Sequence, residues 1–396
     1  MKGQFILIRL FVSLLIVAAC SNQREKEPDL LLANSQQENH LRKNYGQKIT
    51  GMAEEALQEG PFSVMDKNFT PPSGDKHDYM SIGIYWWPNP DREDGLPWIR
   101  KDGQVNPQVR EITDATYYNK TRNNGLVLGL AYHITGEEQY AAKAAELLKT
   151  WFLRDSTKMN PNLNFGQGVP GRTEGRRYGI IETRENAYIF DAIRLIQNSQ
   201  FWNEENTKAM QAWFGQYLDW LLTSTLGQLE GETTNNHGIW YDFQVASIAL
   251  ALGDTVQVEK QLTRAKERIK EHIEADGSQP RELARTKSYS YSTMNLQGMM
   301  ALAMIGEKIG MDLWNYQDEE GAGIQTALDF LLPAALQEQE WQHEQIEPIG
   351  ESMDKLTKLL LVANYKYPDS NYGKTAKKIR ELYELDHELL LGLYQF

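Results

Sequence analysis

The chain has 396 residues, 41% of them hydrophobic, which is enough to bury a large core and excludes a disordered protein. Its formal net charge is −13, from 41 Lys and Arg against 54 Asp and Glu. This acidic balance argues against nucleic acid as a partner, and it would repel a polyanion unless positive charge gathers locally. The only Cys, Cys20, leaves the folded part without a disulfide or a Cys-based metal site.

The first twenty residues have the pattern of a secretion signal. Lys2 and Arg9 are followed by an apolar run at 11–17 that is too short to span a bilayer. The small residues directly before Cys20 resemble a bacterial lipobox, in which that Cys is lipidated and becomes the mature N-terminus. A plain signal peptide is the alternative.

These features predict a chain secreted across the inner membrane and anchored by its lipid, in the periplasm or at the outer membrane. Membrane contact is expected only through Cys20. The predicted segments are a lipoprotein signal peptide at 1–19, a polar tether at 20–39 and one catalytic domain at 40–396, expected to act as a monomer.

Helical periodicity dominates after residue 110. Leu126, Leu130 and Ile134 share one helix face, Thr135-Gly136 ends that helix, and Glu138 stands three residues after Thr135, a capping-box spacing for the next. Apolar helices recur near residues 126, 187, 241, 297 and 356, a spacing of roughly 55–60 residues that predicts an array of helical hairpins. Stacked in a curve, the hairpins make an all-α (α/α) toroid, an incomplete barrel with a cleft on one face.

Three stretches do not fit simple helices. Residues 81–108 are rich in Pro, Gly and Trp, residues 157–180 are rich in Gly, Asn and Arg, and residues 276–290 join two helices. Long connections of this kind in a compact domain usually carry function.

The segment ETTNNHGIWYDF, residues 232–243, places Asn235, Asn236 and His237 where a loop becomes an apolar helix. An Asn at a helix start is often only a cap, and a His there can be structural.

A second segment, RELARTKSYSYSTMNLQG, residues 281–298, gathers positive charge in an acidic chain. It brings Arg281, Arg285 and Lys287 within seven positions and then Tyr289 and Tyr291. A solvated basic turn with core tyrosines is the simpler interpretation.

Together the two segments supply what elimination beside a uronate carboxylate requires. An Asn amide and an Arg guanidinium neutralise the carboxylate and stabilise the enolate-like charge. Tyr and His are suitable to take the C5 proton and to protonate the leaving O4. A nearby Arg favours the phenolate form of a Tyr.

The pairing of NNH with a later DGS, ELAR and Tyr segment resembles the alginate lyase superfamily of (α/α) toroid polysaccharide lyases. ELARTKSYSYSTMNL, YWWPNP and GLPWIRKDGQVNP are most similar to polysaccharide lyase family 38, which includes alginate and glucuronan lyases, and more distantly to family 5 alginate lyases. The resemblance covers most of residues 75–300. It implies an acidic polysaccharide as the partner, either polymannuronate, polyguluronate or glucuronan, and no cofactor.

The resemblance also implies roles for four residues. Asn236 and Arg285 are the implied carboxylate neutralisers, His237 an acid/base or positioning group, and Tyr291 the acid/base. Because the Arg-to-Tyr spacing departs from that of family 5, Tyr289 is the rival to Tyr291, and both are expected to face the cleft.

Further substrate contacts are expected from aromatic and basic side chains. Arg184 begins a helix, where a cation opposes the helix dipole, so a ligand or a carboxylate such as Glu182 is expected to hold it. Salt bridges to the many acids, or simple packing of the tryptophans, are the alternatives. The predicted substrate-binding residues are Trp86, Trp87, Arg177, Tyr178, Arg184 and Tyr289.

No metal site is predicted, since seven scattered His residues form no HxxxH or His-x-His pair. Two other functions compete with the lyase. A glycoside hydrolase on the same toroid needs two carboxylates flanking the bond, for which Asp114, Asp242 and Glu282 are available. A lipid-anchored glycan-binding protein would use the tryptophans and need no base.

Overall fold

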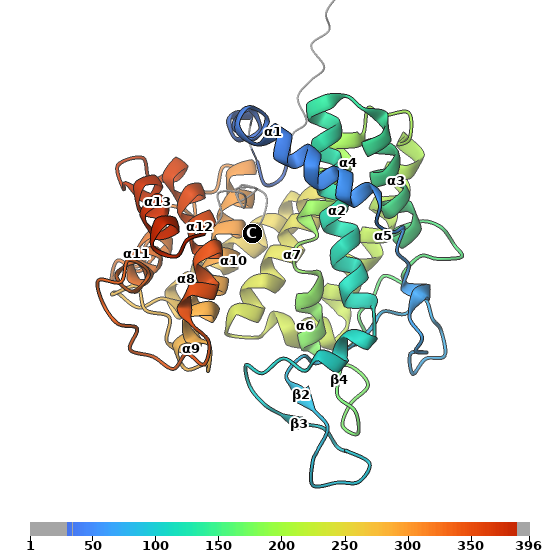
Figure 1. Cartoon of the computed structure of the whole chain (residues 1–396), viewed down its shortest axis with the longest axis horizontal. Coiled ribbons are helices and arrows are strands. Elements are labelled where there is room, and N and C mark those ends of the chain that lie inside the picture. Colours follow the sequence, from blue (N-terminus) through green and yellow to red (C-terminus); the bar gives the residue numbers. More distant parts are fainter. Residues whose placement is uncertain (1–29, 34, 386–396) are drawn as a thin grey trace, which may run out of the picture.

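The computed structural model describes residues 30–33 and 35–385 (Figure 1). The predicted signal peptide and Cys20 lie outside the described residues, so their roles stay predictions. Within the described ranges, no helix is long and apolar enough to cross a membrane.

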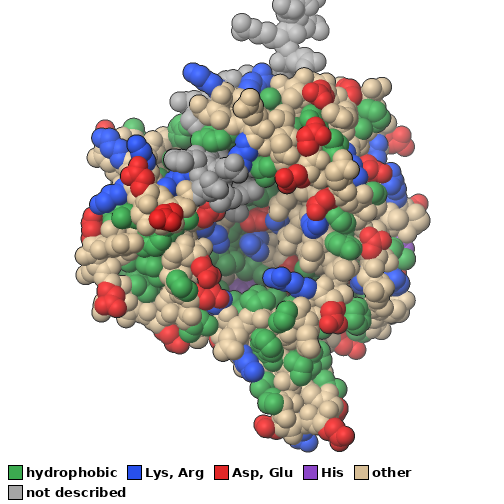
Figure 2. All heavy atoms as spheres, viewed as in Figure 1, with side chains coloured by type: hydrophobic (Ala, Val, Ile, Leu, Met, Phe, Trp, Pro, Cys, Tyr) green, Lys and Arg blue, Asp and Glu red, His purple; other side chains and the backbone are tan. Residues whose placement is uncertain are grey.

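The helices form a curved array of hairpins (Figure 1), and the space-filling view shows a hollow between the two sides of the array (Figure 2). Each inner helix packs against the next, from α2 to α4, α7, α10 and α12. The inner helices are α2 (Asp114–Thr135), α4 (Ala187–Ile196), α7 (Asn236–Leu252), α10 (Ser288–Lys308) and α12 (Met353–Lys366). The outer helices are α3 (Glu138–Phe152), α5 (Glu204–Thr223), α8 (Thr255–His272), α11 (Ile324–Ala335) and α13 (Tyr372–Leu382), and α1 (Ser35–Leu57) lies against α2. The predicted all-α class is confirmed.

The hydrophobic pattern explains which helices lie inside. The inner helix α7 is buried on all its faces from Gly238 to Ala249, as expected for a helix that is apolar all round. Its outer partner α8 is amphipathic, and Val258, Leu262 and Ile269 bury one stripe of it against α7. Each hairpin therefore needs its neighbours to cover its inner helix.

The predicted helix end at Gly136 is confirmed, and one predicted helix start is wrong. Gly136 and Gly253 close α2 and α7 in the left-handed region, with φ of 74° and 82°. The capping box at Thr135 and Glu138 does not form. The Thr135 hydroxyl instead donates to the Ala131 carbonyl at 2.8 Å, so that it belongs to the end of α2.

The three predicted connections hold short elements. β1 (Met80–Ile82) pairs in parallel with β4 (Phe165–Gly168), and β2 (Trp86–Trp87) pairs antiparallel with β3 (Ile99–Arg100) in the part that projects below the ring in Figure 1. The remaining short elements are α6 (Thr225–Gly231), α9 (Pro280–Leu283) and the 3₁₀ helices η1 (Val64–Asp66), η2 (Pro107–Glu111), η3 (Arg177–Thr183) and η4 (Ile349–Ser352). The predicted connection at 276–290 thus contains α9 and the first turn of α10.

The predicted domain boundary at residue 40 is wrong, because residues 30–33 are part of the folded core. Leu30, Leu31 and Leu32 are at most 1% exposed. The buried carboxylate of Asp191 on α4 accepts hydrogen bonds from the backbone N–H of Leu31 at 2.6 Å and of Leu32 at 3.1 Å. The apolar run Leu30–Leu32 inside an otherwise polar segment is the signal that the tether prediction overlooked.

Asp191→Ala should therefore lower the thermal unfolding midpoint. Two backbone donors lose their acceptor where water cannot replace it, which costs about 2 kcal/mol. The control is Asp155→Ala, which removes a surface carboxylate whose side chain is 92% exposed. Equal midpoints for the two variants would show that Asp191 does not hold the N-terminal segment.

Candidate active site

The first turn of α7 carries Asn236 and His237 at the edge of the hollow. Asn235 is the helix cap, and its side-chain oxygen accepts from the His237 backbone N–H at 3.1 Å. The capping interpretation therefore applies to Asn235 and leaves the side chains of Asn236 and His237 for other contacts.

The loop before this turn is held from behind by Arg268 of α8. Its buried guanidinium donates to the Thr233 carbonyl at 2.6 Å, to the Gly231 carbonyl at 2.7 Å and to the Asp242 carboxylate at 2.6 Å. A Cβ at Gly238 would stand 2.0 Å from the Thr233 oxygen, so only glycine allows this close approach. The position of Asn236 follows from these contacts.

Glu282 of α9 orients Asn236. Its buried carboxylate accepts from the Asn236 backbone N–H at 2.7 Å and from Nδ2 at 2.8 Å. Burial raises the pKa of Glu282, and the two hydrogen bonds from Asn236 oppose that rise. Asn236 Oδ1 is buried and has no hydrogen-bond partner within the described part of the chain. Such an unsatisfied polar atom calls for an explanation, and a bound ligand supplies one.

Glu230 of α6 orients His237. His237 Nδ1 lies 2.5 Å from Glu230 Oε1, and this carboxylate group is only 1% exposed. Because an ionised carboxylate only accepts, the pair assigns the proton to Nδ1 and leaves the lone pair of Nε2 available in the neutral ring. The edge of the Tyr178 ring contacts the imidazole, with ring centroids 5.1 Å apart.

Arg285 and Tyr291 form a second group with residues from the 81–108 connection. Arg285 Nη2 donates to Tyr291 Oη at 2.9 Å, and the guanidinium carbon lies 3.9 Å from the centre of the phenol ring. Asp102 accepts from Arg285 Nη2 at 3.0 Å, and Tyr85 Oη lies 2.8 Å from Tyr291 Oη. The connection thus completes the surroundings of Tyr291.

Tyr291 is a neutral phenol near neutral pH. Burial raises its pKa far above the ordinary range, and the neighbouring Tyr85 adds to the rise. The charge of Arg285 lowers the pKa, as expected, but does not outweigh burial. A hydroxyl in this state is suited to donate a proton.

The predicted cleft position of Tyr289 is wrong. Its side chain is fully buried, its hydroxyl donates to the Leu331 carbonyl at 2.9 Å, and its ring packs edge-on against Trp341 at 4.8 Å. Both tyrosines lie on α10, where residues two positions apart point in directions about 200° apart. The helix that presents Tyr291 therefore turns Tyr289 into the core.

Arg177 and Tyr178, two of the predicted substrate-binding residues, lie beside the first turn of α7. With Asn235, Thr233 and Arg281 they line a cavity of about 480 Å³. Figure 2 shows the hollow between the two sides of the ring, with Lys, Arg and His colours at its floor. Positive side chains therefore gather next to Asn236 and His237.

The predicted tryptophan platforms are covered by cations. The guanidinium groups of Arg172 and Arg176 each lie 5.3 Å from the Trp86 ring centre, and Lys101 lies 5.0 Å from that of Trp87. Both tryptophans are partly buried, and Trp87 Nε1 donates to the Gln104 carbonyl at 3.0 Å. They hold basic side chains in place rather than presenting bare rings.

Arg184 lies beside a carboxylate, as expected, but that carboxylate belongs to Glu185 and not to Glu182. Its guanidinium stands 5.4 Å from the Trp240 ring centre and 3.7 Å from the carboxylate of Glu185. Glu182 instead accepts hydrogen bonds from Tyr79 at 2.7 Å and Ser81 at 2.6 Å.

The carboxylates that a glycosidase would need are occupied. Asp114 pairs with Lys67 at 2.9 Å, and both side chains are fully buried. Asp242 pairs with Arg268, and Glu282 is bonded to Asn236. None of these three acids faces a second free carboxylate, which argues against hydrolysis.

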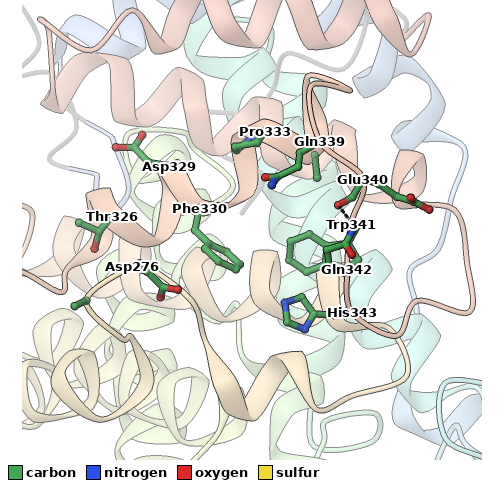
Figure 3. A pocket seen from close by; sticks show the side chains of 12 residues that line it. Asp276, Thr326, Asp329, Phe330, Pro333, Gln339, Glu340, Trp341, Gln342 and His343 are labelled. Carbon is green, nitrogen blue, oxygen red and sulfur yellow. Dashed lines mark hydrogen bonds between the residues drawn. The ribbon is translucent and has the colours of Figure 1, made fainter.

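A larger cavity of about 510 Å³ lies outside this constellation (Figure 3). Its lining includes Phe330, Trp341 and His343 with three acids, Asp276, Asp329 and Glu340, and it contains neither Lys nor Arg. This lining is unsuited to a polyanion. Across residues 30–33 and 35–385, no cluster of three or more His, Cys, Asp or Glu side chains is arranged to hold a metal ion.

Comparison with known proteins agrees with this chemistry. The model of the family described as alginate lyase matches residues 63–341. The chain belongs to the alginate lyase family. The crystal structure of an alginate lyase from Bacteroides ovatus is 34% identical, covers 91% of this chain and 100% of its own, and superposes with a TM-score of 0.85. The protein is a polysaccharide lyase, and its (α/α) toroid is confirmed.

A more distant structure shows the same fold. Alginate lyase A1-III from Sphingomonas species A1 is 15% identical, covers 91% of this chain and 89% of its own, and has a TM-score of 0.51. No curated protein sequence matches this member of the family.

The sequence interpretation of the lyase missed four residues of the site, namely Tyr85, Asp102, Glu230 and Glu282. Glu282 stands within the ELAR motif but was weighed only as a hydrolase acid. Glu230 lies seven residues before His237, on the preceding helix, and no local pattern marks it. Tyr85 and Asp102 reach Tyr291 and Arg285 from about 180–200 positions away, which only the fold reveals.

Glu230→Gln should lower kcat by about tenfold or more, because the amide no longer fixes the imidazole as the carboxylate does. Steady-state kinetics on a uronate polymer would measure the effect. Glu259→Gln, an exposed change on α8, is the control. Normal turnover of Glu230→Gln would show that the orientation of His237 does not limit the reaction.

Proposed function

We propose that the protein cleaves a 1,4-linked uronate polysaccharide, alginate first among the candidates, by β-elimination. The observation that carries the proposal is the Tyr291 hydroxyl, held between Arg285 and Tyr85. Family membership and the naming of the Bacteroides ovatus relative as an alginate lyase support alginate over glucuronan.

Asn236 and Arg285 are proposed to bind the carboxylate at the cleavage point. Asn236 Nδ2 uses one hydrogen on Glu282 and keeps a second for a ligand. Arg285 remains a cation beside Tyr291 although Asp102 pairs with it. Donors aimed at this carboxylate stabilise the charge that spreads onto it only when the C5 proton leaves, which lowers the barrier.

His237 is proposed to take the C5 proton. Its Nδ1 is held by Glu230, so Nε2 is the basic atom, and the buried carboxylate stabilises the imidazolium that forms. Arg177 and Tyr178, which line the adjoining cavity, are proposed to bind the neighbouring sugar.

Tyr291 is proposed to protonate the leaving O4. Its hydroxyl is neutral before the reaction, and the phenolate left afterwards accepts the hydrogen bond from Arg285. The C5–H bond and the C4–O4 bond break, and a C4–C5 double bond forms on the sugar that loses them. His237 keeps the C5 proton, and the proton from Tyr291 ends on the glycosidic oxygen of the leaving fragment, which thereby gains a new reducing end.

Tyr291→Phe should reduce turnover on the order of 10²-fold or more, since the phenyl ring cannot donate a proton. Polymannuronate, polyguluronate and glucuronan would each be digested, and the ultraviolet absorbance of the unsaturated product followed. Tyr289→Phe is the matched control, because it removes a hydroxyl from the same helix that bonds only to the Leu331 carbonyl. Chain cleavage without the absorbance would contradict elimination.

His237→Gln separates the two proton transfers. The amide cannot act as a base, so turnover should fall while the polymer still binds. Because mannuronate and guluronate are C5 epimers, the base must approach from opposite faces, and the two polymers should lose activity to different extents. Undiminished turnover on every polymer would assign both transfers to Tyr291.

We also propose that the lyase is exported and held at the cell envelope by a lipid on Cys20. The small residues before that Cys support this location. Mass spectrometry of the membrane fraction should find a mature N-terminus at Cys20 with lipid attached, and Cys20→Ala should release the enzyme in soluble form. An unmodified Cys20 in the purified protein would contradict the anchor.

A further inference from the structure

A small basic cavity lies between the first and last parts of the ring. It measures about 230 Å³ and opens between α2, the start of α4 and α12. Its charged and aromatic lining consists of Arg122, Glu185, Tyr188, Asp354, Lys355 and Lys358. Side chains from both ends of the helical array therefore line one cavity.

Positive charge exceeds negative charge here. Arg122 pairs with Glu185 at 2.5 Å, both nearly buried, and Lys358 pairs with Asp354 at 2.7 Å. The two acids of the lining thus already have cations. Lys355 and the adjacent Arg184 add two further positive charges, in a chain whose overall charge is −13.

Several donors at this cavity lack partners within the described residues. Lys355 is partly buried and makes neither a hydrogen bond nor an ion pair there. Arg184 Nε and Arg122 Nη1 are buried and equally unsatisfied. Burial and the charge of Arg184 lower the pKa of Lys355 to about 8. Buried cationic donors without acceptors are costly, and an anion placed among them would offset that cost.

Two segments of the chain link this cavity to the catalytic residues beside the hollow. Arg184 packs over Trp240, which lies one helical turn along α7 from Asn236. The helix η3 leads from Arg177 and Tyr178, beside His237, to Arg184, a span of roughly 12 Å at about 2 Å per residue. Figure 2 shows basic side chains within this hollow.

We infer that Lys355, Arg184 and Arg122 bind a second carboxylate of the uronate chain, more than one sugar away from the bond that is cleaved. The inference rests on the proposed function for the identity of the ligand. Arginines recognise a carboxylate through paired donors, and the lysine adds a compact charge. Substrates long enough to reach this position gain affinity that shorter ones lack.

The test compares Lys355→Met with wild type on uronate oligomers of increasing length. Above the length that reaches the cavity, kcat/KM should fall on the order of tenfold or more through a raised KM. Lys377→Met on the exposed side of α13 is the control. An equal loss at every length, or no loss with polymer, would overturn the proposal.

Lys355→Arg restores the charge and should restore the preference for long substrates, which a purely structural role does not predict. In wild type, KM for polymer should rise as pH passes above about 8, because neutral Lys355 must gain a proton to bind. That rise should vanish in Lys355→Arg. The charged groups facing Lys355 are Arg184, Glu185, Lys358 and Asp354.

A binding measurement separates this inference from the proposed reaction. Calorimetry with Tyr291→Phe and the Tyr291→Phe, Lys355→Met double variant needs no turnover. The double variant should bind long oligomers about tenfold more weakly, whether or not unsaturated products are ever formed. Equal affinities in the two variants would exclude the second carboxylate position even in an active lyase.

Discussion

The site depends on the contacts that fix the first turn of α7. Arg268 reaches from the outer helix α8 to two loop carbonyls and to Asp242, so that one guanidinium ties the loop, the inner helix and the outer helix together. Three buried donors and their acceptors satisfy one another there, which keeps the loop from adopting alternatives. Asn236 and His237 come directly after this loop. Their positions therefore depend on the packing of α7 against α8 as well as on the loop sequence.

An acidic protein must still bind an acidic polymer. It does so by placing its carboxylates behind the catalytic side chains. Glu230 faces His237, Glu282 faces Asn236 and Asp102 faces Arg285. Glu230 and Glu282 are each only 1% exposed, and Asp102 is paired with the Arg285 guanidinium. The polymer therefore meets amide, imidazole and guanidinium groups first, while the overall negative charge, screened over about 8–10 Å by salt, acts mainly at longer range.

Much of the architecture could be predicted because hairpins leave a strong periodic signal. The apolar helices at 126, 187, 241, 297 and 356 correspond to α2, α4, α7, α10 and α12. The candidate pairs Asn236–His237 and Arg285–Tyr291 also lie at the ends of helices that line the hollow. These predictions rest on local pattern, which the fold preserves.

The failures share a physical cause, since each depends on contacts between distant segments. Treating 276–290 as a connection hid the start of α10 at Ser288, and with it the rotation that separates Tyr289 from Tyr291. Residues 30–33 looked like tether because their acceptor, Asp191, lies about 160 positions away. Tyr85 and Asp102 belong to a segment without a helical pattern. Only the fold brings this segment next to Tyr291 and Arg285, which lie about 180–200 positions later in the chain.

Burial at Tyr291 has two opposing effects on elimination. It keeps the phenol protonated, as an acid for O4 must be, but it also raises the cost of the phenolate that remains after the proton has left. Arg285 stabilises the phenolate and still leaves the phenol protonated before the reaction. Its charge is shared with Asp102, so it lowers the pKa of Tyr291 only in part. A buried Tyr without Arg285 would have no positive charge beside it to stabilise the phenolate that remains after the transfer. The Tyr291 hydroxyl lies between Arg285 and Tyr85. It is therefore protonated before the reaction, and the phenolate that it leaves is stabilised until it regains a proton.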